Sequence, residues 1–355
     1  MRFIFLSFFI APIAALALCQ KGEMCQIDIP GTQCADGSQS YINYIDRGSE
    51  HLFVYVQGGG ACFDAVTCGC RLKDKDCKGS NEGGDGATAG YLSRPPADAQ
   101  NHPWGEKTEG PIGEASYFEI VYCTGDTFTG AGTVNYGNAL VPRVVRHMGA
   151  VNFQLSIDKA KEIFPQVKKV TVIGASAGGV GVTFNLNHIV RNFGQTDLSV
   201  INDSGIPIFS QFLDSNKMRD VLDKWNVVSS LPADLEKDEL VDFEDVYRYN
   251  ADKFGSVKFA MIGATRDAVF YTYFKMLGGN GDSVKNSIEA TEAILEKTSQ
   301  HKYFVNHGRW HTATFLSSFG MPKELLPVAQ GVNIDDWIRR MVENSSDWVS
   351  LSAQE

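Results

Sequence analysis

A short apolar run that ends in a cluster of small residues, at positions 170–182, constrains the fold of this chain more than any other stretch. The run VTVI has the length and composition of a buried strand, and it leads directly into Gly-Ala-Ser-Ala-Gly around Ser176. The residues that follow can begin a helix, so the segment predicts a strand, a tight turn and a helix. Such a turn exposes the serine at the carboxyl end of the strand, and only small neighbours fit around it.

The segments around this turn alternate between apolar strands and helical stretches. Apolar spacing predicts helices over residues 150–165 and 333–343, and the mostly helical, polar region 211–249 is expected to cap the edge of a sheet. The strands are almost continuously apolar, as in a parallel sheet that helices cover on both faces. We therefore expect an α/β fold in one domain over residues 18–355. The expected strands are residues 40–48 and 51–60, interpreted as neighbours, 115–126, 168–174, 198–205, 257–267 and 301–308.

The first 17 residues have the pattern of a secretory signal peptide. One basic residue precedes a long apolar run, and Ala15 and Ala17 satisfy the small-x-small cleavage rule, so that Leu18 would begin the mature chain. One alternative is an uncleaved membrane anchor, for which the run is short. The other is a lipid-modified Cys19, which the bulky residue before it disfavours. We therefore expect a secreted protein without a stable membrane anchor.

The formal net charge of −10 excludes two classes of partner. Nucleic-acid binding needs a basic surface, and anionic membranes repel an acidic chain. The same charge disfavours a polyanionic polymer as substrate and favours a neutral one. The local basic run at residues 71–78 is interpreted as a solvated loop rather than as a binding site for an acidic polymer.

The cysteine content agrees with export. An even number of cysteines in a secreted chain indicates disulfides, here four of them, in an oxidising compartment, and the sequence does not assign the pairs. A zinc site is the alternative, but Cys62, Cys68, Cys70 and Cys77 lack the paired C-x-x-C spacing of structural zinc ligands. We therefore expect no metal. The candidate half-cystines are Cys19, Cys25, Cys34, Cys62, Cys68, Cys70, Cys77 and Cys123.

A serine hydroxyl on such a turn becomes a nucleophile only with a base nearby. In folds with this turn, an acid and then a histidine follow the serine along the chain, each after a later strand. Asp267 and His311 occupy these places, and Asp203 and His307 are their rivals. Asp203 is interpreted instead as a turn residue that hydrogen-bonds its own backbone. In the predicted triad with Ser176, Asp267 orients the imidazole and His311 takes the serine proton.

Acyl transfer through a serine also needs hydrogen-bond donors for the oxyanion. The amide of Ala177, directly after the nucleophile, is one expected donor. The run Gly-Gly-Gly at residues 58–60 follows an earlier predicted strand and lets the backbone approach a substrate without side chains. An ordinary glycine-rich turn is the alternative, but the two glycine features follow different strands in the order that this chemistry requires.

Six motifs resemble the pectin acetylesterase/Notum family of secreted serine hydrolases. They occur in the family's order over most of the mature chain, as QGGGACF, YCTGDTFTG, GASAGGVGV, NDSG, TRDAVFY and GRWHT. The resemblance implies an α/β-hydrolase-type fold with helical cap insertions and hydrolysis of oxygen esters without a metal or organic cofactor. The residues that it implies are Ser176 as nucleophile, Asp267 as acid, His311 rather than His307 as base, and Gly59, Gly60 and Ala177 as oxyanion donors.

The resemblance leaves the acyl group open, because the family divides between carbohydrate deacetylation and removal of longer fatty acyl groups. Members commonly carry a bulky aromatic in or beside the glycine loop, where this chain has Ala61. We expect a carboxylesterase that acts on O-acetyl esters of cell-wall or extracellular polysaccharide such as pectin. The alternatives are a deacylase for longer acyl chains and a non-catalytic binding protein on the same fold.

Two N-x-S/T sequences match a glycan acceptor, at Asn202 and Asn344. Asn202 is expected at a buried strand end, where no glycan fits. Asn344 is therefore the predicted glycosylation site.

Overall fold

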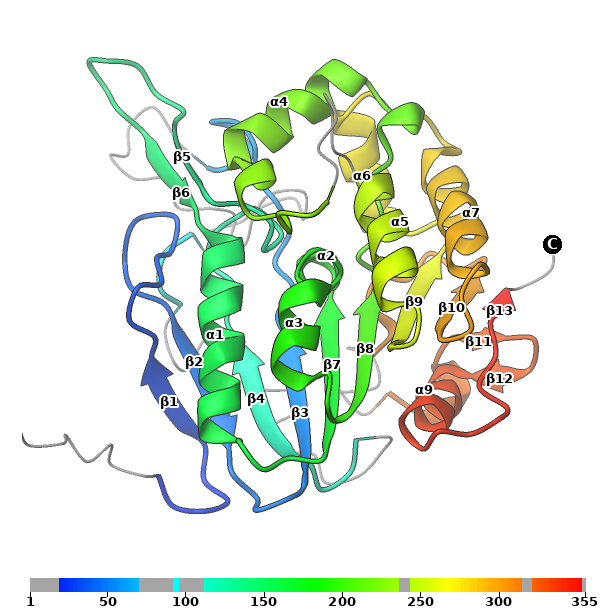
Figure 1. The fold of residues 1–355 in the computed structure, drawn as a ribbon. Helices are drawn as coiled ribbons and strands as arrows, with labels where there is room; N and C mark the ends of the chain where they lie inside the picture. Colours follow the sequence, from blue (N-terminus) through cyan, green and yellow to red (C-terminus); the bar gives the residue numbers. More distant parts are fainter. Residues whose placement is uncertain (1–18, 70–91, 96–111, 236–242, 315–320, 353–355) are drawn as a thin grey trace, which may run out of the picture.

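The computed structural model describes residues 19–69, 92–95, 112–235, 243–314 and 321–352 (Figure 1). The predicted signal peptide, Cys70, Cys77 and the basic run 71–78 lie outside the described residues. Within those residues, none of the helices combines the length and the apolar character that crossing a membrane requires.

The described strands include nine that form one sheet. The first two neighbouring pairs across this sheet are antiparallel and all the following pairs are parallel, so the predicted mostly parallel sheet is confirmed. The order across the sheet is β1 (Cys25–Asp28), β2 (Tyr41–Ile45), β4 (Ser116–Ile120), β3 (His51–Val56), β7 (Lys169–Ala175), β8 (Asp197–Asp203), β9 (Lys258–Ala264), β10 (His301–Asn306) and β13 (Leu351–Ser352).

β4 separates β2 from β3, so the prediction that these two segments are neighbours in the sheet is wrong. Phe118 of β4 lies opposite Tyr44 of β2 on one side and opposite Val54 of β3 on the other. Every residue of β4 is buried, so its backbone groups need a hydrogen-bonding strand at both edges. No local signal marks the insertion, because β4 follows β3 only after a long intervening segment.

Helices cover both faces of the sheet, as predicted. One core contains residues of α1 (Gly149–Ile163), α3 (Leu186–Phe193), α5 (Phe243–Phe254) and α7 (Ser283–Leu295), and α9 (Ile334–Val342) covers the other face. Along β7, Val170 and Val172 belong to the first core, whereas Ile173 and Ala175 belong to the second, with Trp337 of α9. Figure 1 shows α1 and α3 in front of the strands.

Short helices gather beyond the carboxyl ends of the parallel strands, at the top of Figure 1. The region predicted as a helical cap contains η2 (Ser210–Phe212), α4 (Ser215–Trp225), η3 (Val227–Ser229) and the first part of α5. α4 begins at Asp214, whose side chain accepts hydrogen bonds from two amides of the first turn. Its buried face consists of Met218, Val221, Leu222 and Trp225, which recur at the spacing of one helix face.

Two small antiparallel pairs and a short helix were not predicted from the sequence. Strands of two to four residues are too short to show a period. The two pairs are β5 (Gly132–Asn135) with β6 (Val144–His147), and β11 (Val328–Ala329) with β12 (Val332–Asn333), and the helix is η4 (Lys323–Leu325).

Among the described residues, three disulfides tie the amino-terminal third of the chain together. Cys19 pairs with Cys25, Cys34 with Cys123, and Cys62 with Cys68. Cys34 and Cys123 are separated by 89 residues, whereas the partners of each other pair are six residues apart. Disulfides among the candidate cysteines are therefore confirmed for six of the eight.

The predicted acceptor asparagines lie in different environments. Asn202 is fully buried at the end of β8, as expected. Its side-chain amide donates hydrogen bonds to the Thr183 and Tyr247 hydroxyls. Asn344 is exposed, and its glycosylation stays a prediction.

We expect removal of the Cys34–Cys123 disulfide to destabilise the protein more than removal of the Cys62–Cys68 disulfide. A disulfide lowers the conformational entropy of the unfolded chain, and this decrease grows with the length of the loop that the disulfide closes. The double alanine variants should lose about 4.6 kcal/mol and about 2 kcal/mol of unfolding free energy, respectively. Urea denaturation followed by circular dichroism measures both, and the reverse ranking would contradict the loop-entropy explanation.

Candidate active site

Ser176 sits on a strained turn between β7 and α2 (Ala177–Phe184). Its backbone angles are φ 55° and ψ −116°, a conformation that costs a non-glycine residue about 1–3 kcal/mol. The amide of Ser176 donates to the carbonyl oxygen of Asp203 on β8 at 2.8 Å, and its own carbonyl accepts from the amide of Val180 at 3.2 Å. The strand and the helix thus hold the turn from both sides.

The glycine loop at residues 58–60 lies directly against this turn. A Cβ atom on Gly58 would lie 2.8 Å from the carbonyl oxygen of Ala175 and 3.1 Å from the Cβ of Ser176. Only a glycine leaves room for so close an approach of two backbones. The structure therefore places the glycine loop and the serine turn side by side, although they follow different strands.

Two tyrosines hold the glycine loop in one orientation. The Tyr122 hydroxyl donates to the carbonyl of Gly60 at 3.0 Å, and the amide of Ala61 donates to the Tyr273 hydroxyl at 3.0 Å. Burial raises the pKa of Tyr122 well above its ordinary value, so this hydroxyl keeps its proton. In the described part of the chain, the amides of Gly59 and Gly60 have no hydrogen-bond partner.

The amide of Ala177 is the third donor near the serine. Ala177 is the first residue of α2, and amides in a first helical turn have no partner within the helix. The positive end of the helix dipole at this position favours negative charge. All three predicted oxyanion donors therefore lie on the two backbone segments that meet at Ser176.

Asp267 and His311 are in direct contact. Asp267 follows β9 and caps α6 (Ala268–Met276), where its Oδ1 accepts from the amides of Val269 and Phe270. Its Oδ2 lies 2.7 Å from Nδ1 of His311, and the carboxylate is fully buried. Nδ1 donates to this carboxylate, which leaves Nε2 as the imidazole atom that can accept a proton.

His307 and Asp203, the rival candidates, have other partners. Nδ1 of His307 lies 3.0 Å from the hydroxyl of Thr265. The Asp203 carboxylate accepts hydrogen bonds from the amides of Ala313 and Thr314, which lie more than a hundred residues later in the sequence. The interpretation of Asp203 as a residue that hydrogen-bonds its own turn is therefore wrong. The reason is that the sheet order brings the loop after His311 to the end of β8.

An apolar cavity, partly open to solvent, begins at Ser176. Its walls include Met218 and Val221 of the cap helix α4 and Phe270 of α6. The Phe270 ring also packs against His311, with 5.7 Å between the ring centres, so one wall residue of the cavity contacts the imidazole. The sequence analysis missed these wall residues, although the apolar spacing along α4 could have indicated them.

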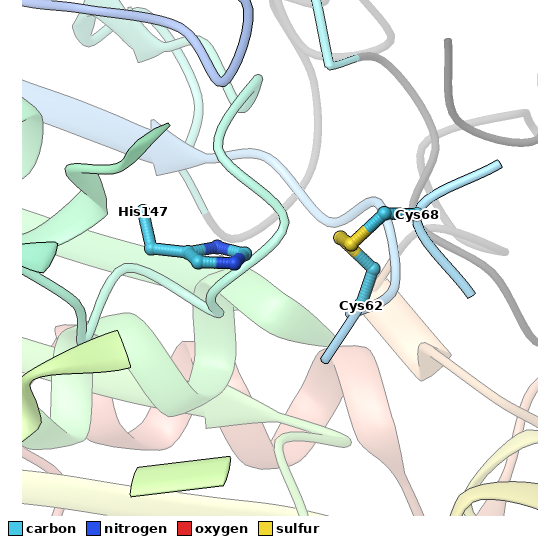
Figure 2. Close-up of side chains that lie close together, drawn as sticks. All are labelled: Cys62, Cys68 and His147. Carbon is cyan, nitrogen blue, oxygen red and sulfur yellow. A yellow bond between two sulfur atoms is a disulfide. The ribbon is translucent and has the colours of Figure 1, made fainter. Parts of the chain in front are cut away.

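Cys62, Cys68 and His147 bring their potential ligand atoms within 4.8 Å of one another, and Figure 2 shows the imidazole facing the sulfurs. The two sulfurs form a disulfide, so neither is a thiolate ligand. Nδ1 of His147 donates to the carbonyl of Thr124 at 2.9 Å, and Nε2 accepts from the Tyr136 hydroxyl at 2.9 Å. With both ring nitrogens engaged, these residues form a packed cluster behind the glycine loop rather than a ligand set.

Comparison with known proteins identifies relatives of this chain. The family model described as pectinacetylesterase matches residues 23–238. The palmitoleoyl-protein carboxylesterase notum2 of Xenopus laevis is 25% identical over 201 residues, and NOTUM of Homo sapiens is 25% identical over 198 residues. These matches cover 54% and 52% of this chain but only 37% and 35% of the two relatives.

The solved structures show the same fold. The Wnt deacylase Notum from Drosophila superimposes with a TM-score of 0.62 at 17% sequence identity, over 93% of this chain and 95% of that one. A second crystal form of the same protein gives a TM-score of 0.60 at 18% identity. The α/β-hydrolase-type fold expected from the sequence is confirmed by this likeness.

We expect the variant His147→Gln to lose less stability at acid pH than the unsubstituted protein. Burial lowers the pKa of His147 to about 4, whereas the unfolded chain titrates near the ordinary value of about 6.5. Between these values the unfolded state binds a proton that the native state does not. The free energy of unfolding therefore falls as the pH falls through this window, by up to about 3 kcal/mol. Urea denaturation at about pH 7.5 and about pH 4.5 measures the effect, and equal pH dependence in both proteins would contradict it.

Proposed function

Because the chain belongs to the pectinacetylesterase family, whose members are carboxylic ester hydrolases, we propose that it is a secreted serine carboxylesterase. The observation that carries this proposal is the strained turn at Ser176 beside the unpartnered amides of the glycine loop, in a chain that also pairs the buried Asp267 with His311. The strained turn and the unpartnered amides lower the stability of the folded protein. Together with the acid–histidine pair they match the nucleophile, the oxyanion donors and the base that acyl transfer requires.

The proposed reaction passes through an acyl-enzyme. His311 takes the proton of Ser176 through Nε2 while the serine oxygen attacks the ester carbonyl, and Asp267 stabilises the imidazolium. The imidazolium then gives its proton to the departing alcohol. Water, activated by the same imidazole, attacks the acyl-enzyme and releases the carboxylic acid.

The oxyanion of each tetrahedral intermediate would lie among the amides of Gly59, Gly60 and Ala177. Donors that are already oriented stabilise developing charge without reorganisation, and each is worth about 3–4 kcal/mol in comparable sites. The hydrogen bonds from Tyr122 and to Tyr273 keep the glycine loop in the orientation that leaves its amides open.

The cavity favours an acyl group longer than acetyl. Its walls are almost entirely apolar, and each buried methylene contributes about 0.8 kcal/mol to binding. The similarity to proteins named palmitoleoyl-protein carboxylesterases points the same way. Acetyl esters of a polysaccharide such as pectin form the second candidate, which the family description favours.

Export to an oxidising compartment is part of this proposal. The disulfides in the described residues are stable there and rare in the cytosol. We propose that residues 1–17 are removed and that one domain begins at Leu18, as the sequence pattern predicts. The cell wall as the final location rests on the pectin candidate alone.

We expect Ser176→Ala and His311→Ala each to abolish ester turnover, because the members of a triad act as a unit. Asp267→Asn should leave a higher residual rate, since loss of the acid alone is typically milder. Hydrolysis of chromogenic esters measures the rates, and a fluorophosphonate probe followed by peptide mapping should modify Ser176.

The matched control is His307→Ala, which should retain turnover because His307 contacts Thr265 instead of the acid. If His307→Ala were inactive while His311→Ala remained active, the assignment of the base would be wrong. A folded protein that neither turns over esters nor reacts with the probe would support the non-catalytic alternative.

We expect Val221→Trp to shift the preference toward short acyl chains. Val221 is buried in the cavity wall, and an indole there would fill the space for the acyl tail. In the unsubstituted protein, kcat/KM on chromogenic esters should rise from acetyl to octanoyl, by up to about fourfold per methylene. The control is Val228→Trp, an exposed position of the cap. A preference for acetyl in the unsubstituted protein would favour the polysaccharide candidate.

A further inference from the structure

We propose that Asp203 and Ser204 are positioning residues that hold His311 in place through the backbone that follows it. The proposal rests on the proposed function, in which His311 is the base. Asp203 ends β8, and Ser204 follows it directly, on the strand next to the one that carries Ser176. Neither side chain is part of the predicted triad.

The Asp203 carboxylate binds the loop after His311 with both oxygens. Oδ1 accepts from the amide of Ala313 at 3.0 Å, and Oδ2 accepts from the amide of Thr314 at 2.7 Å and from the Thr314 hydroxyl. Asp203 is fully buried, where a charge-assisted hydrogen bond is stronger than at the surface. The chain that leaves His311 is therefore tied to the end of β8.

Ser204 completes this contact at the residue nearest the imidazole. Its hydroxyl accepts from the amide of Thr312 at 2.9 Å and donates to Oδ1 of Asp203 at 3.0 Å. The three consecutive amides of residues 312–314 thus donate hydrogen bonds to the adjacent side chains of Asp203 and Ser204. Ser204 and Thr312 both have positive φ, 58° and 62°, so this geometry is held against backbone strain.

The backbone of Asp203 contacts the nucleophile as well. Its carbonyl oxygen accepts the amide of Ser176 at 2.8 Å, and Asp203 lies opposite Ala175 in the register of β7 and β8. One residue therefore joins the turn of the serine to the loop of the histidine. The distance between the nucleophile and the base therefore depends on Asp203, which is neither the nucleophile nor the base.

The chemistry of the site explains why a carboxylate is needed there. Four donors converge on the two oxygens of Asp203, from Ser204, Ala313 and Thr314, the last with both its amide and its hydroxyl. Asparagine has nearly the same shape, but its NH₂ group would replace one of the two acceptor oxygens. That NH₂ group would then face a hydrogen-bond donor of the loop. The loop would have to move away from β8 to relieve that contact. A displacement of about 1 Å in a catalytic group costs about 100-fold in rate.

The test compares Asp203→Asn and Ser204→Ala with the control Asp197→Asn. Asp197 lies at the opposite end of the same strand, where it pairs with Lys258. Two readouts are needed on the full-length protein. The first is kcat and KM on a chromogenic ester. The second is the downfield proton resonance expected for the His311–Asp267 hydrogen bond, whose measurement needs no substrate.

We expect kcat to fall about 100-fold in Asp203→Asn and about tenfold in Ser204→Ala, which loses one neutral hydrogen bond. KM should change less than about twofold, because neither side chain lines the cavity. The downfield resonance should broaden or disappear in both variants and stay unchanged in Asp197→Asn. If Asp203→Asn does not fold, Ser204→Ala decides, since it removes no charge.

Unchanged kcat and an unchanged resonance in folded Ser204→Ala and Asp203→Asn would overturn the proposal. A fall in kcat with an intact resonance would overturn it too, because the rate would then depend on something other than the position of His311. Failure of the proposed function has a separate signature. In that case the unsubstituted protein shows no turnover and no probe labelling, while the resonance still reports whether Asp203 and Ser204 hold the imidazole.

Discussion

The turn at Ser176 is the constraint on which the rest of the site depends. A serine with positive φ between a strand and a helix is strained by about 1–3 kcal/mol, and surrounding contacts must hold it. A side chain on Gly174 would meet the carbonyl of Gly178, and one on Gly178 would meet the carbonyl of Val56 on β3. The pairing of β7 with β3 and β8 provides the rigid frame that keeps the turn in this conformation.

Backbone strain at this site occurs at three connected residues rather than at Ser176 alone. Ser176, Ser204 and Thr312 are three non-glycine residues with positive φ, on loops that follow three different strands. Hydrogen bonds connect them, from the amide of Ser176 to Asp203 and from the amide of Thr312 to the Ser204 hydroxyl. Conformations of this kind persist where neighbouring structure over-determines them, which is typical of sites that need exact placement of reacting groups.

Helix α6 links the polar and apolar halves of the site. α6 begins at Asp267, whose carboxylate accepts two amides of the first turn and the Nδ1 proton of His311. The same helix continues with Phe270 and Tyr273, of which the first lines the cavity and packs on the imidazole and the second binds the glycine loop. One helix therefore contacts the predicted base, lines the cavity and holds the end of the glycine loop.

The sequence by itself determined the features that depend on neighbouring residues, namely the turn at Ser176, the glycine loop, most strands and the order of the candidate residues. Local composition decides these, because small residues and apolar runs act within a few positions. The tertiary structure alone decided how the cysteines pair, that β4 separates β2 from β3, and that an apolar cavity opens at the serine. It also decided the partners of Asp203, which lie 110 and 111 residues away. Contacts at such separations depend on the order of strands in the sheet, and no local pattern encodes that order.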